Sequence, residues 1–173
     1  MTQTAIFLAL RALHVLTAAV WIGSTVFIAA QLTPALEEAG PAGGEVMGRI
    51  GRRGLNAYMT LLGITTVLSG GYLLWRFTGG FSAAVIATHA GAAFAIGGAS
   101  GVLAGVIGGG VVGRSGAAVA TIMPLALSMP DGPDRRTHMQ RVAQLRLRMK
   151  AGTKVVIGLQ LTALVLMTVG HYI

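Results

Sequence analysis

The chain has 173 residues, of which 54% are hydrophobic and only 10% are charged. Soluble domains carry about 25% charged residues, so this chain has too few charges to cover a water-exposed surface. The composition therefore excludes an ordinary soluble domain and indicates a single integral membrane domain over residues 1–173. Cysteine is absent, which also excludes disulfides, thiol nucleophiles and cysteine-based metal centres.

The formal net charge is +8, a value that is also typical of nucleic-acid-binding proteins. Here, however, the basic residues lie in the segments that connect apolar stretches, as they do in membrane proteins. We therefore expect the lipid bilayer as a partner and no nucleic acid.

Four stretches reach the length of about 20 apolar residues that a membrane-spanning helix needs. They cover about residues 4–32, 55–75, 81–112 and 151–172. The first is too long, and its start too poor in basic residues, for a cleavable signal peptide. The sequence therefore predicts an all-α membrane protein, a bundle of four transmembrane helices.

Two further segments lie between the third and fourth spans. Residues 115–129 are apolar but short and contain Pro124, so we expect an interfacial or helix-extending segment rather than a fifth span. Residues 134–149 combine arginines with apolar residues at helical spacing. This pattern predicts a basic amphipathic helix on the cytoplasmic side that leads into the fourth span.

The distribution of lysine and arginine predicts the orientation. The first loop holds three arginines, and the third holds six arginines and one lysine, whereas only Arg76 borders the second loop. Cytoplasmic loops carry the excess of basic residues in membrane proteins. Both basic loops are thus predicted to be cytoplasmic and both termini outside, in a multi-pass protein of a bacterial inner membrane.

Two histidines inside the predicted spans are the main functional candidates, since ionisable groups are costly there. His14 lies about ten residues into the first span and His89 about eight residues into the third, which at about 1.5 Å per residue gives them similar depths. Two histidines on different helices at one depth are what bis-histidine ligation of b-type haem requires. Separate structural roles for the two residues, or another metal such as copper, are the alternatives.

Three other residues are candidates for the same site. Arg11 shares a helix face with His14 and could bind a haem propionate, as could Arg76 at the outer end of the second span. Snorkelling to lipid headgroups is the alternative for both arginines. Trp21 follows His14 by two helical turns and either packs in the core or lines a cofactor. His171, near the end of the fourth span, is expected to be too shallow to pair with the deeper histidines.

The third span has glycines at strict four-residue spacing. This small-xxx-small pattern lets helix backbones approach closely. It predicts a glycine zipper that packs against another helix, either of the same chain or of a second protomer in a homo-oligomer. The glycines are Gly97, Gly101, Gly105, Gly109 and Gly113.

Residues 11–23, RALHVLTAAVWIG, contain a basic residue, Leu-His, and a Trp seven residues after the His. This segment resembles the first helix of CopD-like copper-resistance membrane proteins and of HemJ-type protoporphyrinogen oxidases. The similarity continues over residues 47–75, with a Met, paired arginines and a Gly-containing helix that ends in Leu and Trp. The resemblance implies a four-helix b-haem fold with His14 and His89 at the matched ligand positions, and, in the CopD-like case, copper handling.

The chain departs from the HemJ type at two points. It has Gly91 where that type has a lysine, and it lacks the C-terminal Asn-Glu-x-Pro element. These departures weaken the expectation of protoporphyrinogen oxidation and leave open whether the chain is a membrane oxidoreductase.

The leading functional hypothesis is a small membrane-embedded b-type haem protein that transfers electrons or senses a redox ligand. One alternative is a copper or small-solute handling protein that uses the same histidines without haem. Another is a structural membrane subunit without a cofactor. The sequence does not identify a redox partner.

Overall fold

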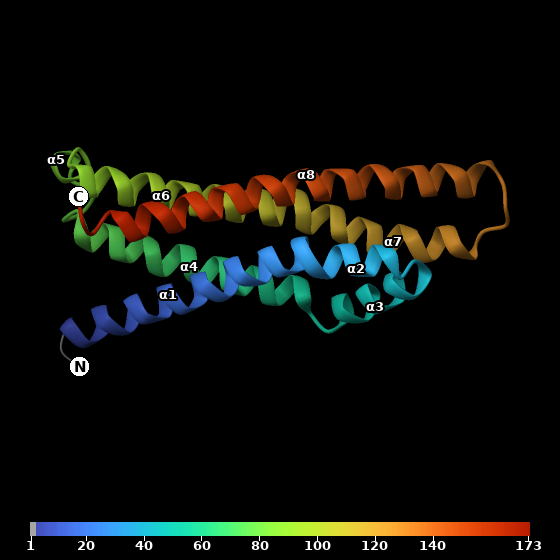
Figure 1. The fold of residues 1–173 in the computed structure, drawn as a ribbon, viewed down its shortest axis with the longest axis horizontal. Coiled ribbons are helices and arrows are strands. Elements are labelled where there is room, and N and C mark those ends of the chain that lie inside the picture. Colours follow the sequence, from blue (N-terminus) through green and yellow to red (C-terminus); the bar gives the residue numbers. More distant parts are fainter. Residues whose placement is uncertain (1–2) are drawn as a thin grey trace.

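A computed structural model describes residues 3–173, which form four long helices arranged side by side along one axis (Figure 1). The described residues contain no β-strand. All four helices are long and apolar enough to cross a membrane, which confirms the all-helical class and the number of candidate spans. The uninterrupted helical stretches are Gln3–Glu38, Leu55–Phe77, His89–Ser128 and Pro133–Val169.

The first stretch is followed by a short helix that folds back on it. Gly40 makes the turn with a φ of 58°, a conformation that favours glycine. Gly43 then allows close packing, since a β-carbon there would lie 2.0 Å from the carbonyl oxygen of Leu36. The elements are α1 (Gln3–Phe27), the π-helical segment η1 (Ile28–Leu32), α2 (Thr33–Glu38) and α3 (Pro41–Arg52).

The third long helix begins later than the apolar run suggests. After α4 (Leu55–Phe77), the chain turns at Gly79, Gly80 and Phe81, all of which have positive φ. A single helical turn, α5 (Ala83–Ile86), follows before α6 (His89–Ile107). Thr88 caps α6, because its hydroxyl accepts a hydrogen bond from the backbone N–H of Gly91 at 3.1 Å. The expected start near residue 81 is thus corrected to His89.

Residues 115–129 largely extend the third long helix. Of the two alternatives predicted for this segment, interfacial or helix-extending, the structure shows the helix-extending one. The π-helical segment η2 (Gly108–Gly113) connects α6 to α7 (Arg114–Ser128) without a break. The basic amphipathic segment and the fourth span likewise form one helix, α8 (Pro133–Val169), of 37 residues. At about 1.5 Å per residue, such a helix is longer than the hydrocarbon core of a bilayer, which is about 30 Å thick.

The core lies where α1, α4, α6 and α8 meet. Trp21, which is 7% exposed, packs there with Ala104 of α6 and Val156 of α8. Two glycines leave room for the indole ring: a β-carbon at Gly63 would lie 3.2 Å from the ring, and one at Gly105 would lie 3.8 Å from it. The indole therefore holds the four helices together at mid-length.

The glycine series of α6 is used unevenly within the chain. A β-carbon at Gly97 would lie 3.3 Å from the Met167 side chain and 3.5 Å from the carbonyl oxygen of Ala163, both on α8. At Gly101 and Gly109 a β-carbon would meet nothing within 4 Å. Only part of the predicted zipper thus forms contacts inside the protomer, and packing against a second protomer stays a prediction.

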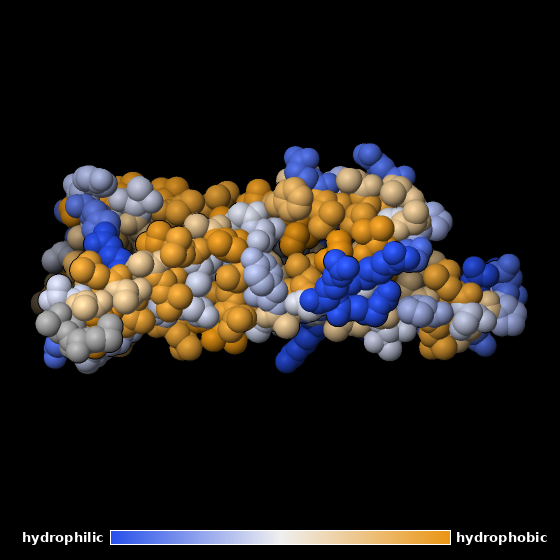
Figure 2. Space-filling view, turned by 90° about the horizontal axis from the view of Figure 1, so that it is seen from below, coloured by the Kyte–Doolittle hydropathy of each residue, from blue (hydrophilic) through white to orange (hydrophobic). Residues whose placement is uncertain are grey.

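Large apolar side chains are exposed on all four long helices, among them Leu16, Leu68, Val106 and Val165. Hydrophilic residues gather mainly toward the end of the molecule that holds α2, α3 and the tip of the α7–α8 hairpin, while most of the face shown in Figure 2 is hydrophobic. A contiguous apolar surface of this extent is what lipid-facing helices present. Together with helix length, it makes the chain a candidate multi-pass membrane protein.

Candidate functional site

His14 is half-buried between α1 and α4 and is held by α4 through one ring nitrogen. Its Nδ1 lies 2.9 Å from the backbone carbonyl oxygen of Thr66 and 3.3 Å from the hydroxyl of Ser69. A carbonyl oxygen can only accept a hydrogen bond, so Nδ1 must carry the proton. The neutral ring then has its free lone pair on Nε2, the nitrogen that a metal would bind.

Gly70 of α4 makes the space in which the imidazole of His14 sits. A β-carbon at position 70 would lie 2.6 Å from Cε1 and 3.0 Å from Nδ1 of the ring. Nearby, the Thr66 hydroxyl donates to the Thr17 hydroxyl at 3.0 Å, which adds a second polar contact between the two helices. The position of His14 is therefore fixed by both hydrogen bonding and shape.

The sequence analysis missed the α4 side of this arrangement. Gly63, Thr66 and Gly70 follow one another at spacings of three and four, so these small residues share one face of α4. The same reasoning that identified the glycines of α6 applies to this face. It would have indicated that α1 packs closely on α4 at the level of His14.

The structure brings Arg11 and His171 together, although they lie in segments far apart in the chain. The guanidinium Nη2 of Arg11 is 3.3 Å from Nε2 of His171. Arginine can only donate, so Nε2 accepts and the proton of this imidazole is on Nδ1. The His171 ring also packs edge-on against Phe94 of α6, with the ring centroids 5.1 Å apart.

The structure does not bring His14 and His89 together. His89 is exposed and is the first residue of α6. Contacts give the relative depth, because Gly98 of α6 faces Leu74 of α4 at 3.7 Å. His89 is about 13 Å of helix rise closer than Gly98 to the end of the bundle that holds α5, while Gly70, against which His14 packs, is about 6 Å farther from that end than Leu74.

The expectation of equal depth is therefore corrected, and the reason is the late start of α6. Depth had been counted from the beginning of the apolar run near residue 81. The residues before His89 form a turn and the short helix α5 instead of the first turns of a long helix.

The two remaining candidates lie apart from His14. Trp21 occupies the core two turns deeper, in agreement with its packing alternative. Arg76 is exposed in the last turn of α4. Within residues 3–173, no three side chains of the types His, Cys, Asp and Glu come together as a metal-binding group. A metal at this end of the bundle would thus have to be held by individual histidines from separate elements.

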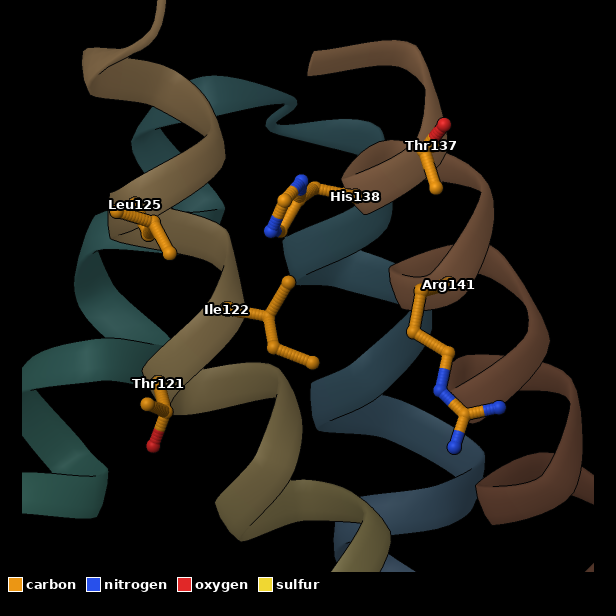
Figure 3. Close-up of a pocket in the computed structure, with 6 residues that line it drawn as sticks. All are labelled: Thr121, Ile122, Leu125, Thr137, His138 and Arg141. Carbon is orange, nitrogen blue, oxygen red and sulfur yellow. The ribbon is translucent and has the colours of Figure 1, made fainter. Parts of the chain in front are cut away.

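Two cavities lie toward the other end of the molecule. One, of about 480 Å³, is between α7 and α8, with Ile122 and Leu125 on one side and His138 and Arg141 on the other (Figure 3). The second, of about 700 Å³, is lined by η2, the start of α7 and the middle of α8. Neither contains a residue that the sequence analysis placed in the haem site.

No protein-family model matches the chain, and no curated protein or solved structure matches it.

Proposed function

We propose that the chain is a multi-pass protein of a bacterial inner membrane, with both termini outside. Eleven of the 13 lysine and arginine residues lie in α3 or directly after it, at the first residue of α7, or in α8 up to Lys154. These elements belong to one end of the bundle (Figure 1), which is the arrangement expected of a cytoplasmic end. Arg11 and Arg76 are near the opposite end.

We further propose that the protein binds b-type haem, with His14 as an axial ligand. The observation that carries this proposal is the 2.9 Å contact between Nδ1 of His14 and the carbonyl oxygen of Thr66. Metal-ligating histidines almost always donate their second ring N–H to a carbonyl or carboxylate, which fixes the tautomer and raises the basicity of the ligating nitrogen. His14 has this orientation, so Nε2 is the ring nitrogen with which it would hold the haem.

Arg11 would contribute to the same site. It precedes His14 by one helical turn toward the outer end, and its guanidinium can bind a carboxylate through two parallel hydrogen bonds. Binding a propionate would require Arg11 to leave His171. A bound haem would supply one-electron redox chemistry, which supports a role in electron transfer or redox sensing.

The second axial ligand has two candidates. His89 is the residue implied by the resemblance to the b-haem membrane proteins, but it lies about 19 Å of helix rise from the level of His14, so it could hold the same haem only if the start of α6 moved. His171 is the histidine that the chain brings into contact with Arg11. The two histidines belong to different parts of the chain: His89 begins α6, and His171 follows the end of α8. Their separate replacement can therefore assign the ligand.

The test is the absorption spectrum of the purified protein after haem reconstitution. A Soret band is expected for the native chain, and His14→Ala should abolish it or convert it. Of His89→Ala and His171→Ala, the variant that changes the iron from low to high spin identifies the second ligand. His138→Ala, near the hairpin tip, is the matched control and should leave the spectrum unchanged. A native chain that takes up no haem would overturn the proposal.

A second candidate function is a cofactor-free or copper-handling membrane protein. The observation that favours it is the close fit of His14 to Ser69 and Gly70, which would also suit a histidine whose role is to join two helices. Titration with copper alone separates these alternatives. Binding lost in His14→Ala supports copper handling, and the absence of both copper and haem binding supports a structural subunit.

A further inference from the structure

A groove of about 700 Å³ lies on the surface where η2 and the start of α7 pack beside α8. Its floor is apolar and includes Ile107, Val111 and Val155. Gly110 opens the floor, because a β-carbon there would meet nothing within 4 Å. The groove is therefore open and apolar at Gly110, where no side chain covers its floor.

Two arginines from different helices line the same groove. Arg114 begins α7, and Arg148 belongs to α8. The ion pairs found among residues 3–173 join Arg49 to Glu45, Arg135 to Asp131 and Lys150 to Glu37, so neither groove arginine takes part in one. The groove thus combines an apolar floor with two positive charges that no carboxylate of the described chain neutralises.

The groove lies at the change from basic to apolar sequence along α8. The residues before Ala151 are rich in arginine, and those after Lys154 are almost entirely apolar. Ile107, on the α6 side, likewise precedes Arg114 by about two turns. In the proposed orientation, this change marks the cytoplasmic surface of the bilayer, with the arginines at the level of the headgroups.

We propose that this groove binds an anionic phospholipid of the cytoplasmic leaflet. The phosphate would lie between the guanidinium groups of Arg114 and Arg148, since arginine matches phosphate in bidentate geometry. An acyl chain would cover the apolar floor at Val111 and Val155. A free anion would leave this floor uncovered, so a lipid fits the groove better than a free anion does. The inference rests on the proposed membrane insertion of the helices and not on haem binding.

Native mass spectrometry of the detergent-solubilised chain tests the proposal. Phosphatidylglycerol and phosphatidylcholine with the same acyl chains are added, and bound lipid is measured. The native chain is expected to retain phosphatidylglycerol preferentially. Arg114→Gln and Arg148→Gln should each weaken retention about fivefold, and the double variant should weaken it more than either single variant does. Arg136→Gln, an exposed arginine of α8 outside the groove, is the matched control and should bind as the native chain does.

The floor is tested separately with Gly110→Leu, which keeps both arginines and fills the groove. It should lose phosphatidylglycerol without loss of helix content, as measured by circular dichroism. Arg148→Lys keeps the charge and should retain most of the lipid. Inorganic phosphate should not displace the lipid; displacement would show an anion site that does not need the acyl chain and would overturn the proposal.

Equal retention of the two lipids, or equal losses in Arg136→Gln and the groove variants, would also overturn the proposal. The haem spectrum of each variant should match that of the native chain, because the groove is remote from His14. Failure of lipid binding with an intact Soret band therefore counts against the groove alone, and loss of the band in the native chain counts against the haem proposal alone.

Discussion

His14 of α1 lies directly against Gly70 of α4, so closely that a β-carbon at position 70 would come within 2.6 Å of the imidazole. The contact explains why the ring can reach the backbone carbonyl of Thr66 and form a hydrogen bond of 2.9 Å. Whether the ring binds iron or only joins two helices, its position depends on the absence of a side chain at residue 70.

Gly70→Ala is therefore expected to displace the His14 ring and to destabilise the fold by about 1–3 kcal/mol, the usual cost of overpacking. Gly71→Ala is the matched control, because a β-carbon there would meet nothing within 4 Å. Thermal unfolding in detergent measures both variants. Equal melting temperatures for the two variants would contradict the contact.

Replacements in the glycine series should separate contacts within the protomer from contacts between protomers. Gly97→Leu is expected to lower thermal stability, since the new side chain would meet Met167 and the backbone of Ala163. Gly101→Leu faces open space in the protomer, so its stability should be unchanged. If a second protomer packs on this face, Gly101→Leu will instead reduce the oligomer fraction in size-exclusion chromatography with light scattering.

The buried amide of Gln160 offers a stabilising substitution. Its Nε2 donates to the Thr25 hydroxyl at 3.4 Å and so joins α8 to α1. Its Oε1 is buried without a hydrogen-bond partner in residues 3–173, and such an atom costs about 1–3 kcal/mol. Gln160→Met, of similar size, should therefore preserve or raise the melting temperature, whereas Gln160→Ala should lower it by leaving a cavity.

The absence of cysteine makes the orientation easy to test. Ser82→Cys, in the short connection before α5, should react with a membrane-impermeant maleimide added to intact cells. Arg136→Cys, near the start of α8, should react only after the membrane is permeabilised. The opposite labelling pattern would reverse the proposed topology and place the lipid groove in the other leaflet.

Arg11 and Arg76 should differ in their effect on haem retention. Arg11 is one helical turn from His14 and already orders the segment after α8 through His171. Arg76 is in the last turn of α4. Arg11→Ala is expected to lose haem faster than Arg76→Ala when apomyoglobin is added as an acceptor. Identical loss rates would remove Arg11 from the site.

The number of long helices could be predicted from the sequence because each apolar stretch is long enough to be recognised alone. The depth of a given residue along its helix could not be predicted in the same way. The apolar residues 81–88 continue the hydropathy of the third span, although Thr88 caps α6 and the residues before it form a turn. The Thr-His-Ala-Gly sequence at 88–91 contains the cap signal, but hydropathy alone conceals it.

The contact between Arg11 and His171 depends on tertiary packing and has no counterpart in a local pattern. The sequence predicts that His171 is too shallow to pair with the deeper histidines, and this prediction says nothing about a contact with Arg11. The long side chain of Arg11 extends toward the helix N-terminus and reaches His171. Sequence periodicity identifies the face on which Arg11 lies but not which distant segment covers it.

α8 is one unbroken helix that runs between the two ends of the molecule. From Arg148, this helix continues to Val169 without a proline or a π-helical segment. The next residue, Gly170, packs on Phe94 of α6. The single helix therefore fixes the distance along its axis between the groove that Arg148 lines and the chain end that contacts Arg11, so these two regions keep their separation when the helix moves as a whole.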